Sequence, residues 1–446
     1  MTRMLLQTKG DPMNMKPFLG YFQFLPLLVC WAIFGCCDSV SYVKAEKTVP
    51  NCYANYKLDN GRKLLGNNNY PAFSYSGYRT EIRKVENCPT VEEIKEDMKI
   101  LSAIGIKLIR TYNTQDFPQF SRTLQAIRQL KQADPDFEMY VMLGAWISCK
   151  GAYGPSPDHG KEDYTFNKSQ IDTAIELANK FPGIVKIIAV GNEAMVRWQA
   201  HFVPPSVIGK WVNYLKEART TGKIPAKTLI TTSEYWAALG GEKSYHSEDL
   251  LELLRQIDFV SLHTYAFHET FYSRALEWAV VEEADLTAAQ QAANAINRAI
   301  AHQISQYKAV KQYLQANGIN KEIHIGETGW ASLDNSHYGN NGTCAASEYN
   351  AKLFYDAVRQ WTTENNITCF YFEAFDEPWK SNGTDGSEGH FGLFTVDGKA
   401  KFALWDMVDE GVFEGLTRGG NTIAKTHNGN KKVLLKKLKA PKIKKN

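Results

Sequence analysis

The chain has 446 residues, of which 44% are hydrophobic and 22% are charged, an ordinary globular balance with ample material for a core. Its net charge is +3, and the body is mildly acidic once the lysine-rich last 20 residues are set apart, so we see no reason to expect nucleic acid as the main partner. The length allows two or three average domains, but one α/β barrel can absorb most of it.

The N-terminus has the pattern of a targeting segment. Arg3, Lys9 and Lys16 precede an apolar run over residues 17–34. A basic flank followed by an apolar stretch is typical of an export signal. The sequence Ile33-Phe34-Gly35-Cys36 also resembles a bacterial lipoprotein cleavage site. We therefore expect residues 1–46 to be an export signal or a lipoprotein or membrane anchor, with the protein exported to the cell envelope or outside the cell.

Cysteine usage indicates neither a complete disulfide framework nor a metal site. Five cysteines follow the leader, an odd number, so they cannot all pair within the chain: Cys52, Cys88, Cys149, Cys344 and Cys369. No CxxC pair or Cys/His metal spacing occurs. We expect no cofactor and no metal, and we expect Cys369, within an apolar run, to be a buried free thiol.

The body of the chain alternates short apolar runs with longer stretches of helical pattern. The runs are rich in β-branched or aromatic residues and mostly continuous, as expected of parallel strands covered on both faces. Eight runs fit this description: residues 71–75, 106–112, 139–146, 184–192, 229–234, 259–265, 322–327 and 369–375. Between them, Thr90 to Glu93 has the pattern of a helix capping box. The alternation predicts a single (β/α)8 TIM barrel as the catalytic domain over residues 60–415.

Two segments depart from a plain barrel. About 55 residues separate Tyr265 from Glu322, and residues 276–314 have a helical pattern, so we expect a helical insertion after strand six. Insertions at that end lie on the catalytic face, where this one could wall off one end of a cleft. Residues 427–446 hold eight lysines and no acid, which predicts a basic, disordered tail.

Two glutamates follow apolar runs directly. Glu193 comes after the fourth run, and Glu327 ends the seventh. Barrel active sites are built at the carboxyl ends of strands, and strands four and seven face one another across the mouth. Paired carboxylates, one protonated and one ionised, are what glycoside cleavage needs. The competing interpretation is that both are ordinary surface acids at strand ends.

The motifs around these residues resemble a known family. Gly191-Asn192-Glu193 resembles the acid/base motif of retaining barrel glycosidases. Gly326-Glu327-Thr328-Gly329-Trp330 resembles the nucleophile motif of glycoside hydrolase family 17. The segments that resemble that family's strand-eight, strand-one and strand-two sequences are residues 372–380, 390–394, 75–79 and 109–112. The resemblance spans about residues 72–404.

This resemblance implies a retaining enzyme that needs no metal and acts on β-1,3-glucan. It implies Glu193 as the general acid/base, Glu327 as the nucleophile and Asn192 as a partner of the sugar 2-hydroxyl. Further substrate contacts are expected from Tyr75, Arg110, Tyr112, Glu234, Tyr265, Trp330, Glu377, Trp379, Lys380 and Glu388. Core packing is the alternative for the aromatic residues Tyr265, Trp330 and Trp379, and a solvated surface position is the alternative for Lys380. His263 is expected to be structural or substrate-orienting.

Three functions share these features. The first is hydrolysis of β-1,3-glucan or its oligosaccharides, and the second is β-1,3-glucanosyl transfer by the same two glutamates. The third is a non-catalytic glucan-binding surface protein, which would have no need of paired strand-end carboxylates. The expected insertion after strand six departs from the compact form described for endo-acting members, so it favours short chains or exo attack.

Overall fold

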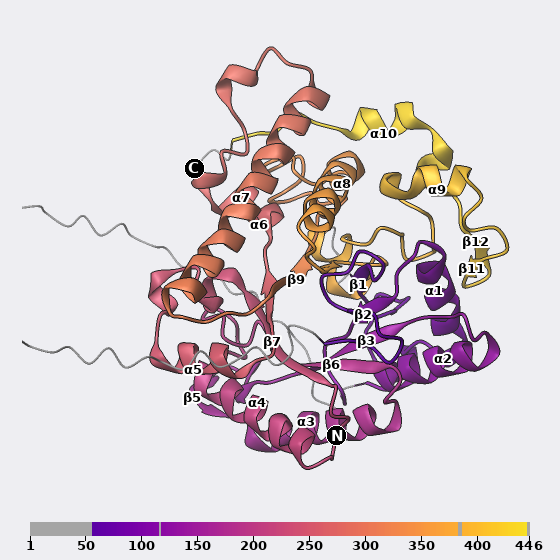
Figure 1. Ribbon diagram of the computed structural model, residues 1–446. Helices are drawn as coiled ribbons and strands as arrows, with labels where there is room; N and C mark the ends of the chain where they lie inside the picture. Colours follow the sequence, from indigo (N-terminus) through magenta and orange to yellow (C-terminus); the bar gives the residue numbers. More distant parts are fainter. Residues whose placement is uncertain (1–55, 116, 382–385, 444–446) are drawn as a thin grey trace, which may run out of the picture. The chain divides into compact units, whose positions relative to one another are not determined.

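Eight parallel strands close into a barrel. The computed structural model describes residues 56–115, 117–381 and 386–443. The strand order is β1-β10-β9-β8-β7-β6-β3-β2, so strands that follow one another around the barrel also follow one another in the sequence (Figure 1). Their bounds are β1 Ala72–Ser74, β2 Leu108–Arg110, β3 Tyr140–Ala145, β6 Val185–Asn192, β7 Leu229–Tyr235, β8 Val260–His263, β9 Ile323–Thr328 and β10 Cys369–Tyr371. Each lies within or overlaps one of the eight predicted runs, and the predicted TIM barrel is confirmed.

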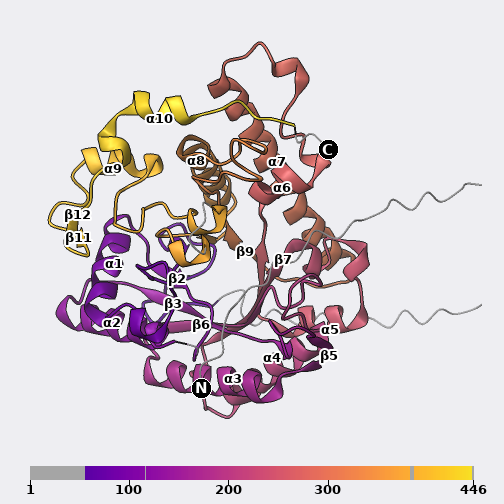
Figure 2. The same cartoon turned by 180° about the vertical axis from the view of Figure 1, so that it is seen from behind.

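Helices surround the strands, as the views from both sides show (Figures 1 and 2). They are α1 Val91–Ala103, α2 Gln119–Ala133, α3 Tyr164–Lys180, α4 Pro205–Thr220, α5 Glu248–Gln256, α7 Ala288–Ala316 and α8 Glu348–Glu364. The capping box predicted for the first of these is present. The hydroxyl of Thr90 accepts from the backbone N–H of Glu93, and the Glu93 carboxylate accepts from the backbone N–H of Thr90.

Strand residues alternate between two cores. Leu108 and Met142 point into the barrel, where they pack with the buried segment that precedes β1, including Leu64. Their neighbours Ile109 and Leu143 point outward, against the helices. Because successive side chains of a strand face opposite sides, this alternation determines which residues further along each strand point toward the inside of the barrel. The segment before β1 closes the amino-terminal end of the barrel, so a site can open only at the carboxyl end.

The insertion after strand six is helical, as predicted. After β8 come α6 (Ala266–Tyr272) and the 29-residue α7. Figure 1 shows α7 running beside α6 and α8, with the connection before it extending beyond the barrel. Glu269 of α6 fastens the two helices, because its carboxylate accepts from Gln306 of α7 at 2.5 Å and from Tyr235, at the end of β7, at 2.8 Å.

The prediction of a disordered C-terminal tail is wrong for residues 427–443. Residues Lys431–Lys437 form helix α10, and the Asn430 side chain caps it by accepting from two backbone N–H groups. Leu434, within the helix, and Leu438, directly after its last residue, are both buried. The lysines dominate the composition of the segment, but these two leucines supply an apolar side that docks on the barrel.

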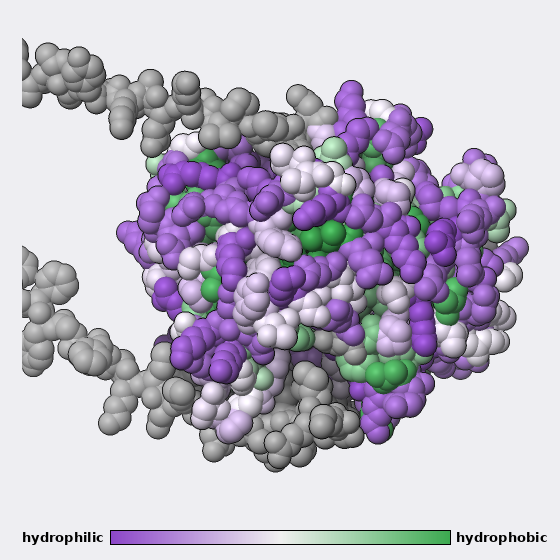
Figure 3. Space-filling view, turned by 90° about the horizontal axis from the view of Figure 1, so that it is seen from below, coloured by the Kyte–Doolittle hydropathy of each residue, from purple (hydrophilic) through white to green (hydrophobic). Residues whose placement is uncertain are grey.

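The predicted export segment, residues 1–46, lies outside the described residues, as does Cys52. Among the helices that the structure describes, none is long and apolar enough to cross a membrane. Cys88, Cys149, Cys344 and Cys369 are buried free thiols, as expected for Cys369. Figure 3 shows apolar side chains as separate spots on a mainly hydrophilic face, wherever grey atoms do not cover it.

The packing of α10 predicts a difference between two adjacent leucines. Leu434→Ala removes a buried anchor at a cost of roughly 2 kcal/mol and should release the tail. Leu435→Ala, at an exposed position of the same helix, is the matched control. Limited trypsin digestion should cleave among the tail lysines much faster in the first variant than in the second. Equal cleavage rates would contradict the docking of α10.

Candidate active site

The side chains of the candidate site meet at the carboxyl ends of four strands. Arg110 ends β2, Glu193 follows β6, His263 ends β8 and Glu327 lies near the end of β9. A carboxylate oxygen of Glu193, a carboxylate oxygen of Glu327 and a ring nitrogen of His263 all lie within 4.8 Å of one another. The carboxyl groups of retaining glycosidases lie about 5–5.5 Å apart, and the short distance between these two oxygens is compatible with that arrangement.

Glu327 is buried and held as an anion. Arg110 donates to one carboxylate oxygen, and the Tyr265 hydroxyl donates to the other at 2.8 Å. Burial alone would raise the pKa of Glu327, but the positive charges of His263 and Arg110, with the hydroxyl bond, lower this pKa to about 2. The carboxylate is therefore ionised throughout the neutral range and able to attack an electrophilic carbon.

Glu193 has a more open setting than Glu327. Its side chain is 21% exposed, and Oε1 faces His263 Nδ1 at 3.1 Å. Oε2 accepts from the Gln199 side-chain amide at 3.3 Å. The backbone here is left-handed, with φ of +48° at Glu193 after +80° at Gly191, so the chain turns sharply where the strand ends.

Irregular pairing precedes both carboxylates. The register between β6 and β7 shifts between Ala189 and Asn192, just before Glu193. The register between β8 and β9 shifts so that His263 pairs with Glu327 after Leu262 has paired with Ile325. Such irregularities redirect side chains at barrel rims and next to active sites.

Arg110 links Glu327 to Asn192 through hydrogen bonds. Arg110 is almost fully buried and bridges β6 and β9, because Nη1 donates to Glu327 while Nη2 donates to Asn192 Oδ1 at 2.5 Å. The ring of Tyr112 packs against the same guanidinium at 4.9 Å. Arg110 was predicted to contact substrate, but the structure shows it positioning two other side chains.

Glu234 was also predicted as a substrate contact, and this is wrong. Its carboxylate is fully buried and accepts from the backbone N–H groups of Ala194 and Met195, at 3.0 Å each. Burial is the main cause that raises its pKa to about 8, aided by the charge of Glu193 and opposed by these two bonds. Glu234 lies four residues after Ile230 on the same strand, so its side chain points outward as that of Ile230 does. It therefore holds the turn that carries Glu193 and does not face the barrel mouth.

Tyr75 and Trp330 were predicted to contact substrate, and both predictions are wrong. Tyr75 has the outward parity of Phe73, and its hydroxyl donates to Asp97 of α1 at 3.0 Å. The Trp330 indole is buried and donates to the Ala345 carbonyl at 2.9 Å. For Trp330 the structure shows the alternative, core packing, and Tyr75 also packs in the core.

A second acidic cluster follows β10. Lys380 Nζ lies 3.3 Å from a carboxylate oxygen of Glu373 and forms an ion pair with Glu377, whose carboxylate also accepts from the Trp379 indole at 3.1 Å. Burial and the charge of Glu377 raise the pKa of Glu373 well above its usual value. Burial acts the same way on Glu377, but Lys380 outweighs it and lowers that pKa.

Glu373 was absent from the predicted site residues. The signal that could have found it is its position at a strand end. Glu373 follows β10 by two residues, just as Glu193 follows β6 and Glu327 lies near the end of β9. Glu388, in contrast, is exposed, and its carboxylate lies 3.0 Å from His268 Nε2 of α6. That pair joins the loop after β10 to the insertion, a contact that the sequence gave no means of predicting.

Within the described part of the chain, the group with the spacing to hold a metal ion is Glu193, His263 and Glu327. The buried guanidinium of Arg110 already supplies positive charge to Glu327 there. The predicted absence of a metal or cofactor stays a prediction.

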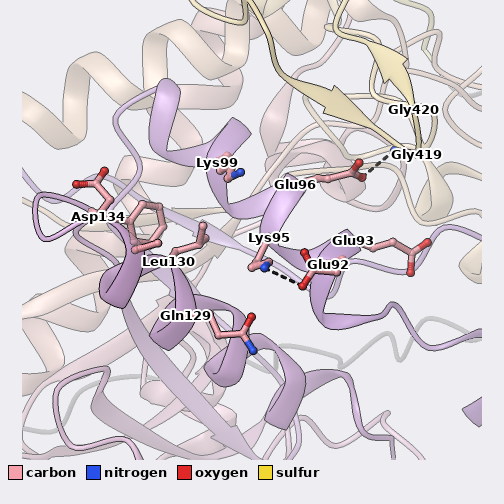
Figure 4. A pocket seen from close by; sticks show the side chains of 12 residues that line it. Glu92, Glu93, Lys95, Glu96, Lys99, Gln129, Leu130, Asp134, Gly419 and Gly420 are labelled. Atoms are coloured by element: carbon pink, nitrogen blue, oxygen red, sulfur yellow. Dashed lines mark hydrogen bonds and ion pairs between the residues drawn. The ribbon is translucent and has the colours of Figure 1, made fainter.

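Two hollows lie apart from the paired glutamates. One, of about 530 Å³, lies between α1, α2 and the turn joining β11 (Thr417–Arg418) to β12 (Asn421–Thr422), where Lys95 pairs with Glu92 and Glu96 accepts from Gly419 (Figure 4). The other, of about 650 Å³, lies between the loops after β9 and β10 and the tail. Neither is lined by Glu193 or Glu327.

The charge environment of Glu327 gives a titration prediction. Arg110→Met removes an adjacent cation, so the pKa of Glu327 should rise by about 1–3 units. Wild-type protein gains stability from ionised Glu327 at pH values above its ordinary pKa, and this gain is lost only as the pH falls toward about 2. Carbon NMR titration of the glutamate carboxyl groups measures the shift. Arg128→Met, which removes a guanidinium from the outer helix α2, should leave this carboxyl unchanged.

Comparisons with known proteins agree with this architecture. The family model of the BtgE/BtgC glycoside hydrolase domain matches residues 72–392. A glucan 1,3-beta-glucosidase of Arthroderma benhamiae is 26% identical over 326 residues, covering 71% of this chain and 85% of that protein. A probable glucan endo-1,3-beta-glucosidase, btgC, of Aspergillus flavus is 26% identical over 71% of this chain. The matched part makes up only 40% of the length of the Aspergillus protein.

Two solved structures resemble the chain. An endo-laminarinase from Formosa Hel1_33_131 is 51% identical with a TM-score of 0.83, covering 86% of this chain and 98% of that one. A Rhizomucor miehei beta-1,3-glucanosyltransferase in complex with laminaritriose is 21% identical with a TM-score of 0.51, covering 75% and 96%, a likeness of fold alone. Because the family model matches most of its length, this chain belongs to the BtgE/BtgC glycoside hydrolase domain family.

Proposed function

We propose that the protein is a retaining hydrolase of β-1,3-glucan, with Glu193 as general acid/base and Glu327 as nucleophile. The observation that carries the proposal is the pairing of a buried, ionised carboxylate with a more open one, less than 5 Å away, at the barrel mouth. Retaining hydrolysis needs an ionised carboxylate and a second carboxyl group that can carry a proton, both close to the cleaved bond.

The reaction follows from this geometry in two steps. Glu327 attacks the anomeric carbon while Glu193 protonates the leaving oxygen, which forms a covalent glycosyl–enzyme and frees the departing chain. Glu193, now ionised, takes a proton from water, and the water oxygen attacks the same carbon and releases Glu327. The Asn192 amide oxygen is occupied by Arg110, so its NH2 group is left to donate to the sugar 2-hydroxyl.

His263 supports both carboxylates. Its Nδ1 lies 3.1 Å from Glu193 and 3.6 Å from Glu327, and its Nε2 lies 2.7 Å from the Ser233 hydroxyl. Ser233 in turn lies 2.8 Å from Ser261, so these two hydroxyls hold Nε2 and fix the ring. A proton on Nδ1 then faces both carboxylates, where it can stabilise the negative charge that Glu193 gains when it gives up its proton.

The proposed substrate comes from the relatives and the site together. The Formosa relative, aligned over 98% of its length, is named an endo-laminarinase, and the Arthroderma relative is named a glucan 1,3-beta-glucosidase. The first name supports internal cleavage, whereas the insertion of α6 and α7 led us to expect short chains or exo attack. We propose β-1,3-glucan as the substrate and internal cleavage as the mode. The N-terminal pattern supports an exported enzyme, tethered or released.

Glucanosyl transfer uses the same two glutamates. In that reaction a sugar hydroxyl replaces water in the second step, so products longer than the substrate appear. The direct test incubates the protein with laminarin and a laminari-oligosaccharide series and follows product masses over time. A ladder of shorter oligosaccharides supports endo hydrolysis, glucose appearing first indicates exo attack, and no turnover would remove the proposed function.

Replacing the nucleophile separates catalysis from binding. Glu327→Ala should reduce laminarin turnover to background, because no group remains to form the glycosyl–enzyme. Azide should restore cleavage of a dinitrophenyl glycoside and give the α-glycosyl azide, as expected if the attacking carboxylate is missing. Glu364→Ala, at an exposed position that ends α8, is the control. Unchanged turnover in Glu327→Ala would overturn the nucleophile role.

Replacing the acid should produce selective slowing. Glu193→Ala should slow formation of the glycosyl–enzyme from laminari-oligosaccharides by about 10²–10⁴-fold, because the sugar oxygen needs a proton to leave. The same step with dinitrophenyl laminaribioside, whose leaving group needs no proton, should change far less. Pre-steady-state kinetics measures both, and equal slowing would exclude Glu193 as the acid.

A further inference from the structure

We propose that Trp198 forms a binding subsite for a glucosyl residue on the leaving-group side of the cleaved bond. This inference rests on the proposed function and adds to it the position of the departing chain. Trp198 is 67% exposed, whereas Trp330, the tryptophan next to Glu327 in the sequence, is buried. An exposed indole needs no explanation by itself. Its location and its rigid support provide the argument.

The location follows from the two oxygens of Glu193. Oε1 faces His263 and the side of Glu327, while Oε2 accepts from Gln199. Trp198 is the residue directly before Gln199, so it lies on the loop that contacts Oε2, the oxygen of Glu193 that does not face His263. Glu193 protonates the leaving oxygen in the proposed reaction, and the departing sugar chain therefore extends past this loop.

The loop is held from several directions. Glu234 fixes its first turn through the N–H groups of Ala194 and Met195. The N–H of Arg197 donates to the Tyr245 hydroxyl at 3.2 Å, and its guanidinium donates to the Ser244 carbonyl at 2.8 Å.

The indole itself has a partner behind it. The ring of Tyr235, at the end of β7, packs against Trp198 with centroids 5.6 Å apart and planes at 75°. Contacts to β7 and to the chain that follows it hold the loop, so the exposed indole is presented in a fixed position and a ligand need not order it. Such preorganisation lowers the entropic cost of binding.

The chemistry of this surface fits a neutral sugar. An indole offers a flat apolar face, and the axial C–H groups of a β-linked glucosyl ring present a matching apolar face. Arg197 is the nearest cation in sequence. Its guanidinium lies over the Tyr245 ring at 4.4 Å and donates to the Ser244 carbonyl, so it is already engaged by protein groups. A subsite beyond the cleaved bond requires chain on that side, which favours internal cleavage over removal of terminal glucose, and it also offers a place for an acceptor sugar.

The test compares three variants by cleavage of laminarihexaose labelled with ¹⁸O at its reducing end. Trp198→Ala should lower kcat/KM about tenfold and move cleavage toward the reducing end, since sugars beyond the bond lose their platform. Trp198→Phe should keep most of the wild-type rate and pattern. Tyr214→Ala removes an aromatic ring from the outer helix α4, against Trp211, and should match wild type.

A second substrate separates binding from catalysis. The kcat for dinitrophenyl laminaribioside, when limited by hydrolysis of the glycosyl–enzyme, should be unchanged in Trp198→Ala because the departing group has left before that step. A loss in this step would mean that Trp198 acts through Glu193, and it would overturn the subsite. Wild-type rate and cleavage pattern in Trp198→Ala would also overturn it, while leaving the hydrolase standing. Failure of the wild-type protein to cleave laminarihexaose would remove both.

Discussion

The buried ion pair of Arg110 with Glu327 is the constraint on which the active site depends. Burying two charges is costly unless hydrogen bonds satisfy the rest of each group. Here the guanidinium also donates to the Gly326 carbonyl and to Asn192, and the carboxylate also accepts from Tyr265. These bonds join the ends of β2, β6 and β9 to Tyr265, which lies two residues after the end of β8. A single charged network therefore sets both the geometry of the barrel mouth and the ionised state of Glu327.

Environment, and not residue type, differentiates the acids of this protein. Glu327 is held as an anion by adjacent cations, while Glu234 and Glu373 have raised pKa values because they are buried near other carboxylates. Glu193 has a different setting, partly open and shared between His263 and Gln199. In the proposed reaction this division supplies the nucleophile and the group that exchanges protons, while the other buried acids hold loops in position.

The aromatic residues divide in a similar way. Tyr265 and Tyr112 pack around the buried charges, and Trp330 packs in the core against Phe267 and Phe354. Trp198 is held at the surface on a fixed loop. The residues that touch Glu327 thus form a closed base, whereas the side of Glu193 opens toward solvent, as the proposed polymer substrate would require.

The sequence by itself determined the barrel, the helical insertion and the positions of Glu193 and Glu327, because apolar runs, helical spacing and strand-end acids are local patterns. It did not determine which way a strand-end side chain points. The side chains of Glu234 and Tyr75 point outward, as do those of Ile230 and Phe73 on the same strands. The register shifts before Glu193 and Glu327 depend on pairing with neighbouring strands. The docking of α10 likewise depended on a surface built by distant residues. Orientation and burial come from partners far away in the chain, and only the tertiary structure brings those partners together.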